Sequence, residues 1–123
     1  MENNHNKIHH SFGFAFAGIA HAFKENRNIR IHAVVAALVL IASFILGLTK
    51  FEKIIIVLAV VLVIASEMIN TAIEEMVDLI TNEHKEEAKR AKDVAAGMVF
   101  VASIGALIIG IAIFAPYIIK LLE

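Results

Sequence analysis

The chain has 123 residues, of which 59% are hydrophobic, and a formal net charge of −1. Soluble domains average about 45–50% apolar residues, so this composition indicates that lipid surrounds much of the protein. The absence of cysteine excludes disulfides, thiolate metal sites and covalently attached haem. We expect no nucleic-acid partner.

The N-terminal segment is polar and is followed by a short amphipathic stretch. Residues 1–10 lack the apolar core of a cleavable signal, and we expect them to be a disordered head. Ser11 is a suitable N-cap for a helix over residues 11–25. Its apolar side chains recur at helical spacing on one face, namely Phe12, Phe16, Ile19 and Phe23. This helix is too short to span a bilayer, so it is expected to lie on the membrane surface or to pack against the bundle with the same face.

Three stretches are apolar and long enough to be transmembrane helices. About 20 helical residues cross a hydrocarbon core of about 30 Å. We place the spans at residues 29–48, 54–80 and 92–119. The second span must continue past Glu67 to be long enough, and we expect it to extend as helix into the cytoplasm. The sequence therefore predicts an all-α membrane protein with three transmembrane helices, a surface helix and one domain over residues 1–123.

The basic residues are distributed unevenly between the two ends of these spans. Eight lie before the first span or between the second and third: Lys7, Lys24, Arg27, Arg30, Lys85, Lys89, Arg90 and Lys92. Three lie at the other ends: Lys50, Lys53 and Lys120. The positive-inside rule then predicts a multi-pass protein of the cell membrane with a cytoplasmic N-terminus and a C-terminus outside.

The second span carries a stripe of polar side chains. At 100° per residue, Glu67, Asn70, Glu74 and Asp78 fall within an arc of about 80°, and the stripe is about 16 Å long. Glu75 lies off the stripe. A carboxylate at the depth of Glu67 costs about 2–3 kcal/mol or more, and such residues commonly mark function. Hydrogen bonds that join helices are the structural alternative, but four polar residues on one arc favour a functional site.

Cations near the cytoplasmic end of the stripe complement its charge. Lys92 and Asp93 stand where the third span enters the membrane. Carboxylates together with basic side chains suit a Mg²⁺-bridged phosphate, because Mg²⁺ prefers oxygen ligands and cations neutralise a transferring phosphoryl group. The chain has no P-loop, no protein-kinase motif set and no HExxH.

Three motifs resemble a known family. They are E-x-x-N-T-A-I-E-x-x-x-D at residues 67–78, A-K-D-x-A-A-G at 91–97 and R-N-I-R-I-H at 27–32. The sequence resembles the small prokaryotic integral-membrane diacylglycerol kinases over about residues 11–117. Within the family it is more similar to the Gram-positive branch, whose members act as undecaprenol kinases.

The resemblance implies a homotrimer that transfers the γ-phosphoryl group of MgATP to a lipid alcohol at the cytoplasmic face, with active sites between subunits. Glu67 matches the family's general base and Asn70 the polar residue one turn later. Glu74 matches a carboxylate that binds the metal of MgATP. The positions that match nucleotide-binding residues are Glu74, Glu83, His84, Lys85, Lys92 and Asp93.

One position departs from the family pattern. The family usually has Glu immediately before the R-N-x-x-x-H segment as a second metal ligand, and here that position is Asn26, with Glu25 one residue earlier. Either Glu25 reaches the metal after a local shift, or Asn26 supplies a neutral oxygen.

The sequence therefore predicts an ATP-dependent lipid kinase that acts on undecaprenol or diacylglycerol with Mg²⁺. Two alternatives remain at this stage. An acidic stripe in a small oligomer could serve a cation transporter or channel, and the change at Asn26 is compatible with a non-catalytic member of the family.

Overall fold

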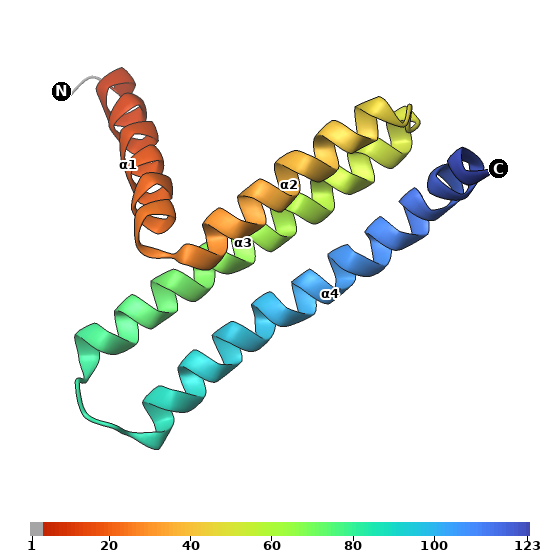
Figure 1. Cartoon of the computed structure of the whole chain (residues 1–123). Coiled ribbons are helices and arrows are strands. Elements are labelled where there is room, and N and C mark those ends of the chain that lie inside the picture. The colour runs from red at the N-terminus through yellow and green to blue at the C-terminus, as the bar shows by residue number, and fades with distance from the viewer. Residues whose placement is uncertain (1–3) are drawn as a thin grey trace.

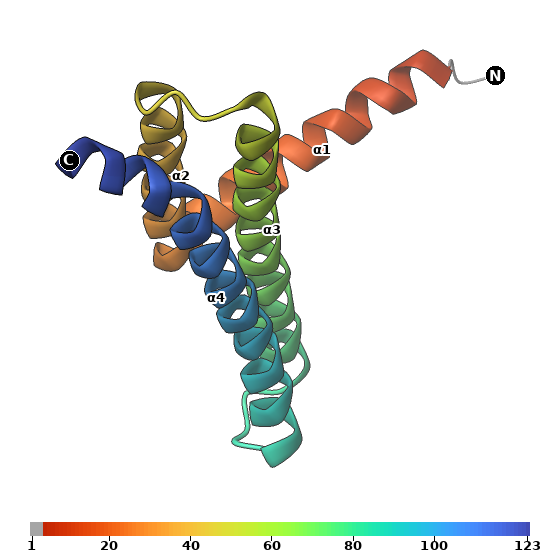
Figure 2. The ribbon, with the colours of Figure 1, turned by 90° about the vertical axis from the view of Figure 1, so that its right-hand side faces the viewer.

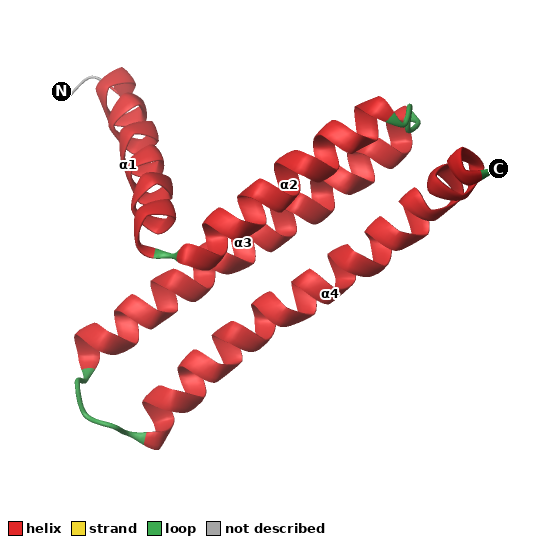
Figure 3. Cartoon of the chain, viewed as in Figure 1, coloured by secondary structure: helices red, strands yellow, loops and turns green. Residues whose placement is uncertain are grey.

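The computed structural model describes residues 4–123 as four helices joined by short loops (Figure 3). The helices are α1 (Asn4–Glu25), α2 (Arg27–Ile45), α3 (Lys50–Ile80) and α4 (Glu86–Leu122). Within this range there is no strand, and α2, α3 and α4 are long and apolar enough to cross a membrane. The predicted all-α fold with three spanning helices is confirmed.

Helix α1 leaves the bundle at a steep angle to the other helices (Figures 1 and 2). It already begins at Asn4, whereas the sequence pattern placed its start at Ser11. Residues 4–10 contain neither glycine nor proline, so nothing in their backbone chemistry stops the helix from extending. Residues 1–3 of the expected polar head lie outside the described part of the chain. Phe12 and Phe16 are exposed at 63% and 70%, so the bundle of this chain leaves this part of the apolar face of α1 uncovered, whereas Phe23 near the end of the helix is half-buried.

The turn between α2 and α3 is set by local sequence. Gly47 adopts a positive φ of 68°, and its N–H donates to Phe44 O while the N–H of Leu48 donates to Ser43 O. Glycine tolerates this left-handed conformation, which closes the last turn of a helix. Thr49 then caps α3 through a reciprocal pair of hydrogen bonds with Glu52.

Helix α3 is the central element, and each of the other three helices packs against it. Helix α4 runs antiparallel beside it over most of its length (Figure 1). Two alanines of α4 seven residues apart, Ala95 and Ala102, are buried, which lets the two backbones approach closely. At the far end of the bundle the hydroxyl of Tyr117 donates to Glu52 Oε2 at 2.6 Å and joins the end of α4 to the start of α3.

Candidate active site

Four neighbouring polar residues of α3 are buried in the middle of the bundle. They are Ser66, Glu67, Asn70 and Thr71, with exposures of 3%, 1%, 6% and 7%. The hydroxyls bond within the helix, because Ser66 donates to Val63 O and Thr71 donates to Glu67 O. The side chains of Glu67 and Asn70 need other partners, since an unpaired buried polar group is costly.

The Glu67 carboxylate contacts one side chain of α2 and the N-cap residue that precedes α2. Asn26 Nδ2 donates to Glu67 Oε2 at 3.1 Å, and His32 Nε2 lies 3.2 Å from Glu67 Oε1. Both oxygens of this buried carboxylate therefore have a polar neighbour. The pairing requires α2 and α3 to pack in one register, because 41 residues separate Asn26 from Glu67.

Asn26 uses both ends of its amide. Its Oδ1 accepts from the backbone N–H groups of Asn28 and Ile29 and caps α2, while its Nδ2 donates to Thr71 Oγ1 at 2.8 Å as well as to Glu67. The residue at the family's metal position thus links the start of α2 to α3. Glu25 is exposed at the end of α1.

One turn beyond Glu67, Asn70 Nδ2 donates to Glu74 Oε1 at 3.0 Å. Asn70 Oδ1 is buried and has no hydrogen-bond partner among the described residues. A buried acceptor without a partner needs an explanation. Mg²⁺ is commonly held by one or two protein oxygens and completes its shell with water and phosphate oxygens. A half-buried Glu74 carboxylate beside the free oxygen of Asn70 fits that requirement.

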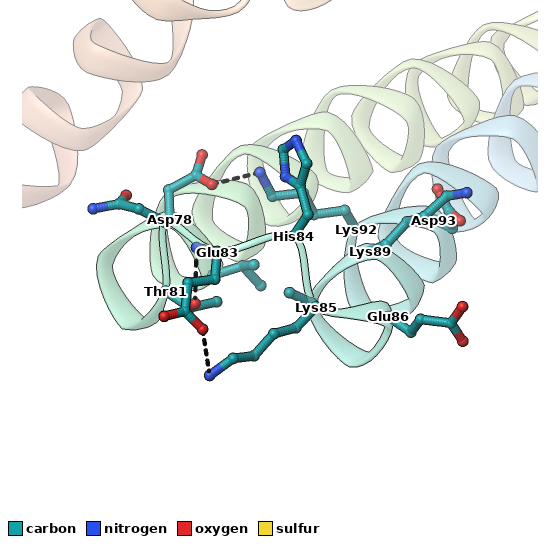
Figure 4. Close-up of a pocket in the computed structure, with 12 residues that line it drawn as sticks. Asp78, Thr81, Glu83, His84, Lys85, Glu86, Lys89, Lys92 and Asp93 are labelled. Atoms are coloured by element: carbon teal, nitrogen blue, oxygen red, sulfur yellow. Dashed lines mark hydrogen bonds and ion pairs between the residues drawn. The ribbon is translucent and has the colours of Figure 1, made fainter.

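Two turns further toward the end of α3, the stripe meets α4. Lys92 Nζ donates to Asp78 Oδ1 at 2.5 Å. The pair lies in a polar pocket of about 610 Å³ built around the loop between α3 and α4 (Figure 4). His84 lines the same pocket as the Lys92–Asp78 pair, and Glu83 contacts Lys85.

The pocket gathers most of the residues that the sequence assigned to the nucleotide. Glu83, His84, Lys85, Lys92 and Asp93 all line it. Glu74 does not line it and lies one turn earlier on α3, between the pocket and the buried cluster. The predicted stripe therefore continues from a buried end at Glu67 to an open, charged end at Asp78.

Other groups near the site were not assigned from the sequence. His32 and Thr71 lie inside the motifs quoted above, but their contacts with Glu67 and Asn26 depend on how α2 packs on α3. The off-stripe carboxylate of Glu75 faces α1 instead, where His21 Nε2 lies 2.6 Å from its Oε1. Both of these side chains are about half exposed.

The chain is similar to proteins of one known family. The family described as "Prokaryotic diacylglycerol kinase" matches residues 13–114. The undecaprenol kinase of Bacillus subtilis is 43% identical over 114 residues, which cover 93% of each chain. The diacylglycerol kinase of Synechocystis is 39% identical over 91% of this chain and 65% of its own length, and that of Haemophilus influenzae is 37% identical over 72% and 75%. The chain belongs to the prokaryotic diacylglycerol kinase family.

Proposed function

We propose that this protein is a lipid kinase that transfers the γ-phosphoryl group of MgATP to the hydroxyl of a membrane lipid alcohol. The proposal rests on how the surroundings of α3 change along its length. From Glu67 to Asp78, α3 advances about 16 Å and passes from a buried polar cluster to an open polar pocket. A kinase that joins these two substrates needs a buried end for the lipid hydroxyl and an open end for the soluble nucleotide, within one site.

The open end suits the nucleotide. Lys92 and Lys85 bring positive charge to the pocket, and His84 and Asp93 add polar groups. Positive groups placed around a transferring phosphoryl group stabilise the charge that spreads over its oxygens. We assign Lys92, Asp93, Glu83, His84 and Lys85 to binding ATP.

The middle of the stripe suits the metal of MgATP. Glu74 is the proposed metal ligand, and Asn70 Oδ1 can add a second protein oxygen. When bound, Mg²⁺ neutralises charge on the phosphates and fixes their orientation. Asn26 Oδ1 already accepts two backbone N–H groups, so of the two candidates at the family's second metal position, Glu25 has the more available oxygen.

The buried end suits the alcohol. We assign Glu67 to the removal of the hydroxyl proton. Asn70 keeps Glu74 in place one turn away. Undecaprenol is favoured over diacylglycerol because the undecaprenol kinase of Bacillus subtilis is similar over nearly the whole chain.

The proposal also includes the orientation of the chain in the membrane and its oligomeric state. The polar pocket would face the cytoplasm, where ATP is available, with the N-terminus on the same side and the C-terminus outside. Three copies would form the active unit, as the family resemblance implies. Light scattering of the purified protein in detergent measures the copy number directly.

The decisive experiment offers the purified protein in lipid a panel of alcohols together with γ-labelled ATP. Label should enter undecaprenol or diacylglycerol, and Glu67→Gln should abolish the transfer. Ion flux through proteoliposomes without ATP turnover would instead indicate a channel or transporter. MgATP binding without transfer to any lipid would indicate a non-catalytic family member.

A further inference from the structure

The elbow between α1 and α2, residues 22–30, contains a single residue that belongs to neither helix. Helix α1 ends at Glu25, α2 begins at Arg27, and Asn26 between them has an extended backbone. Helix α1 leaves the bundle from this elbow at a steep angle (Figures 1 and 2). A change in that angle therefore has to pass through the backbone around Asn26.

Side chains within the elbow cap both helix ends that meet there. Asn26 Oδ1 accepts from the first free N–H groups of α2. Arg30 of α2 reaches back to the end of α1, where its Nη1 donates to Phe23 O at 2.8 Å and to Lys24 O at 2.7 Å. The backbone N–H of Asn26 donates to Ala22 O at 2.9 Å. Three carbonyls of the last turn of α1, which have no partner within a helix end, are thus satisfied.

The bonds of Arg30 do more than supply positive charge. A basic residue that only orients the chain in the membrane needs no fixed geometry, and Arg27, which is also exposed and lies one turn earlier, supplies the same charge. A cation at the end of α1 also complements the negative end of the helix dipole. The two hydrogen bonds of Arg30 therefore tie the last turn of α1 to the first turns of α2.

The elbow places Asn26 beside the buried carboxylate of α3. Asn26 Nδ2 donates to Glu67 Oε2 at 3.1 Å and to Thr71 Oγ1 at 2.8 Å. Ala22 and Ile29, on the two sides of Asn26, are exposed by only 5% and 0%, so the elbow is packed as well as capped. A rotation at the elbow would carry the Asn26 amide away from Glu67.

We propose that Arg30 is a positioning residue for the phosphoryl transfer: by holding the end of α1 against α2, it keeps Asn26 in contact with Glu67. This inference rests on the proposed function and adds a residue to it. Arg30 acts through Asn26 and is not assigned to either substrate. A small displacement of a group beside the reacting atoms lowers the rate steeply, so the elbow controls kcat.

The activity test compares substitutions at two neighbouring arginines. Arg30→Met removes the donors and the charge, so kcat should fall about tenfold while the KM for MgATP stays within about twofold. Arg30→Lys keeps a cation with three N–H donors and should recover most of kcat. Arg27→Met removes the same charge one turn earlier and should keep nearly wild-type activity.

A double variant tests whether Arg30 acts through Asn26. If it does, adding Arg30→Met to Asn26→Ala should lower kcat no further than Asn26→Ala alone, because both substitutions remove the same contact with Glu67. Losses that multiply in the double variant would show that Arg30 acts by another route.

The angle of the elbow can be measured without activity, because the natural sequence contains no cysteine. Nitroxide labels at Ala17→Cys on α1 and Leu38→Cys on α2 occupy exposed positions. Pulsed electron paramagnetic resonance, with labelled chains diluted in unlabelled protein, reports the distance between the two labels. Arg30→Met should broaden this distance distribution, whereas Arg30→Lys and Arg27→Met should leave it narrow. If Arg30→Met does not fold in detergent, Arg30→Gln takes its place under the same criteria.

The outcomes separate the two proposals. If the wild-type protein phosphorylates no lipid, the proposed function is wrong, and the label distances still decide whether Arg30 holds the elbow. A distribution as narrow in Arg30→Met as in the wild type would exclude that role. So would an active Arg30→Met protein that retains more than about half of the wild-type kcat. A rise in the KM for MgATP with unchanged kcat would instead assign Arg30 to the nucleotide.

Discussion

Lys92 of α4 donates to the carboxylate of Asp78 on α3 and so fixes the polar pocket across the loop that joins the two helices. Fourteen residues separate the partners in sequence. The Lys92 side chain is 36% exposed, so its charge remains accessible to a ligand in the pocket.

Replacing Lys92 by Met should weaken nucleotide binding. A charge-assisted hydrogen bond contributes about 1.5–3 kcal/mol, so the KM for MgATP should rise about tenfold or more. Lys92→Arg should keep most of the affinity because it keeps the charge. Arg90→Met is the matched control, since Arg90 is exposed and forms its ion pair with Glu87, one turn away on the same helix. An equal rise in KM for Arg90→Met and Lys92→Met would remove Lys92 from the nucleotide site.

The link that Asn26 makes between α2 and α3 predicts a loss of stability when it is removed. Asn26→Ala deletes an N-cap, which costs about 1 kcal/mol, and leaves Glu67 Oε2 without its donor, which costs about 1–3 kcal/mol more. Thermal unfolding in detergent measures this loss. Asn28→Ala is the control, because only the backbone N–H of Asn28 takes part in the cap. Equal midpoints for the two variants would contradict the role given to Asn26.

A carboxylate at position 26 should make stability depend on the metal. Asn26→Asp keeps an oxygen that can cap α2 but brings a second negative charge to Glu67, and like charges at this distance repel each other. We expect a lower unfolding midpoint than the wild type without Mg²⁺ and a larger rise when Mg²⁺ is added. A Mg²⁺ response no larger than that of the wild type would show that position 26 is out of reach of the metal.

The three spans and the polar stripe could be predicted from the sequence because both are properties of a single helix. Apolar length identifies a span, and the angular spacing of Glu67, Asn70, Glu74 and Asp78 needs no knowledge of neighbouring helices. The hydrogen bond between Asn70 and Glu74, one turn apart, follows from the same spacing.

The environment of Glu67 could not be predicted in this way. His32 lies on α2 and Asn26 is the residue before this helix, and their positions beside Glu67 follow from packing rather than periodicity. The sequence offered one signal of this environment. His32 ends the R-N-I-R-I-H motif, and Asn26 directly precedes it. The start of α1 was misplaced because a polar stretch without glycine or proline can be helix or coil, and composition does not decide between them.

The orientation of the chain can be tested with introduced cysteines, because the natural sequence contains none. Asn82→Cys places a thiol in the loop between α3 and α4, and Lys50→Cys places one at the start of α3. In intact cells a membrane-impermeant maleimide should label residue 50 and spare residue 82. After the membrane is opened, both should react. Labelling of residue 82 in intact cells would invert the proposed topology.

The adjacent carboxylates of Glu74 and Glu75 offer the sharpest matched comparison. Glu74 accepts from buried Asn70 on the stripe, whereas Glu75 is exposed and pairs with His21 on α1. An exposed ion pair contributes about 0–1 kcal/mol, so Glu75→Gln should change activity by no more than a few fold. Glu74→Gln removes the proposed metal ligand and should raise the Mg²⁺ concentration needed for half-maximal rate at least tenfold. The charge change and the position along α3 are nearly the same in both variants, so the difference in Mg²⁺ dependence reports which face of the helix meets the metal. If both variants require the same Mg²⁺ concentration, the metal does not bind on the stripe.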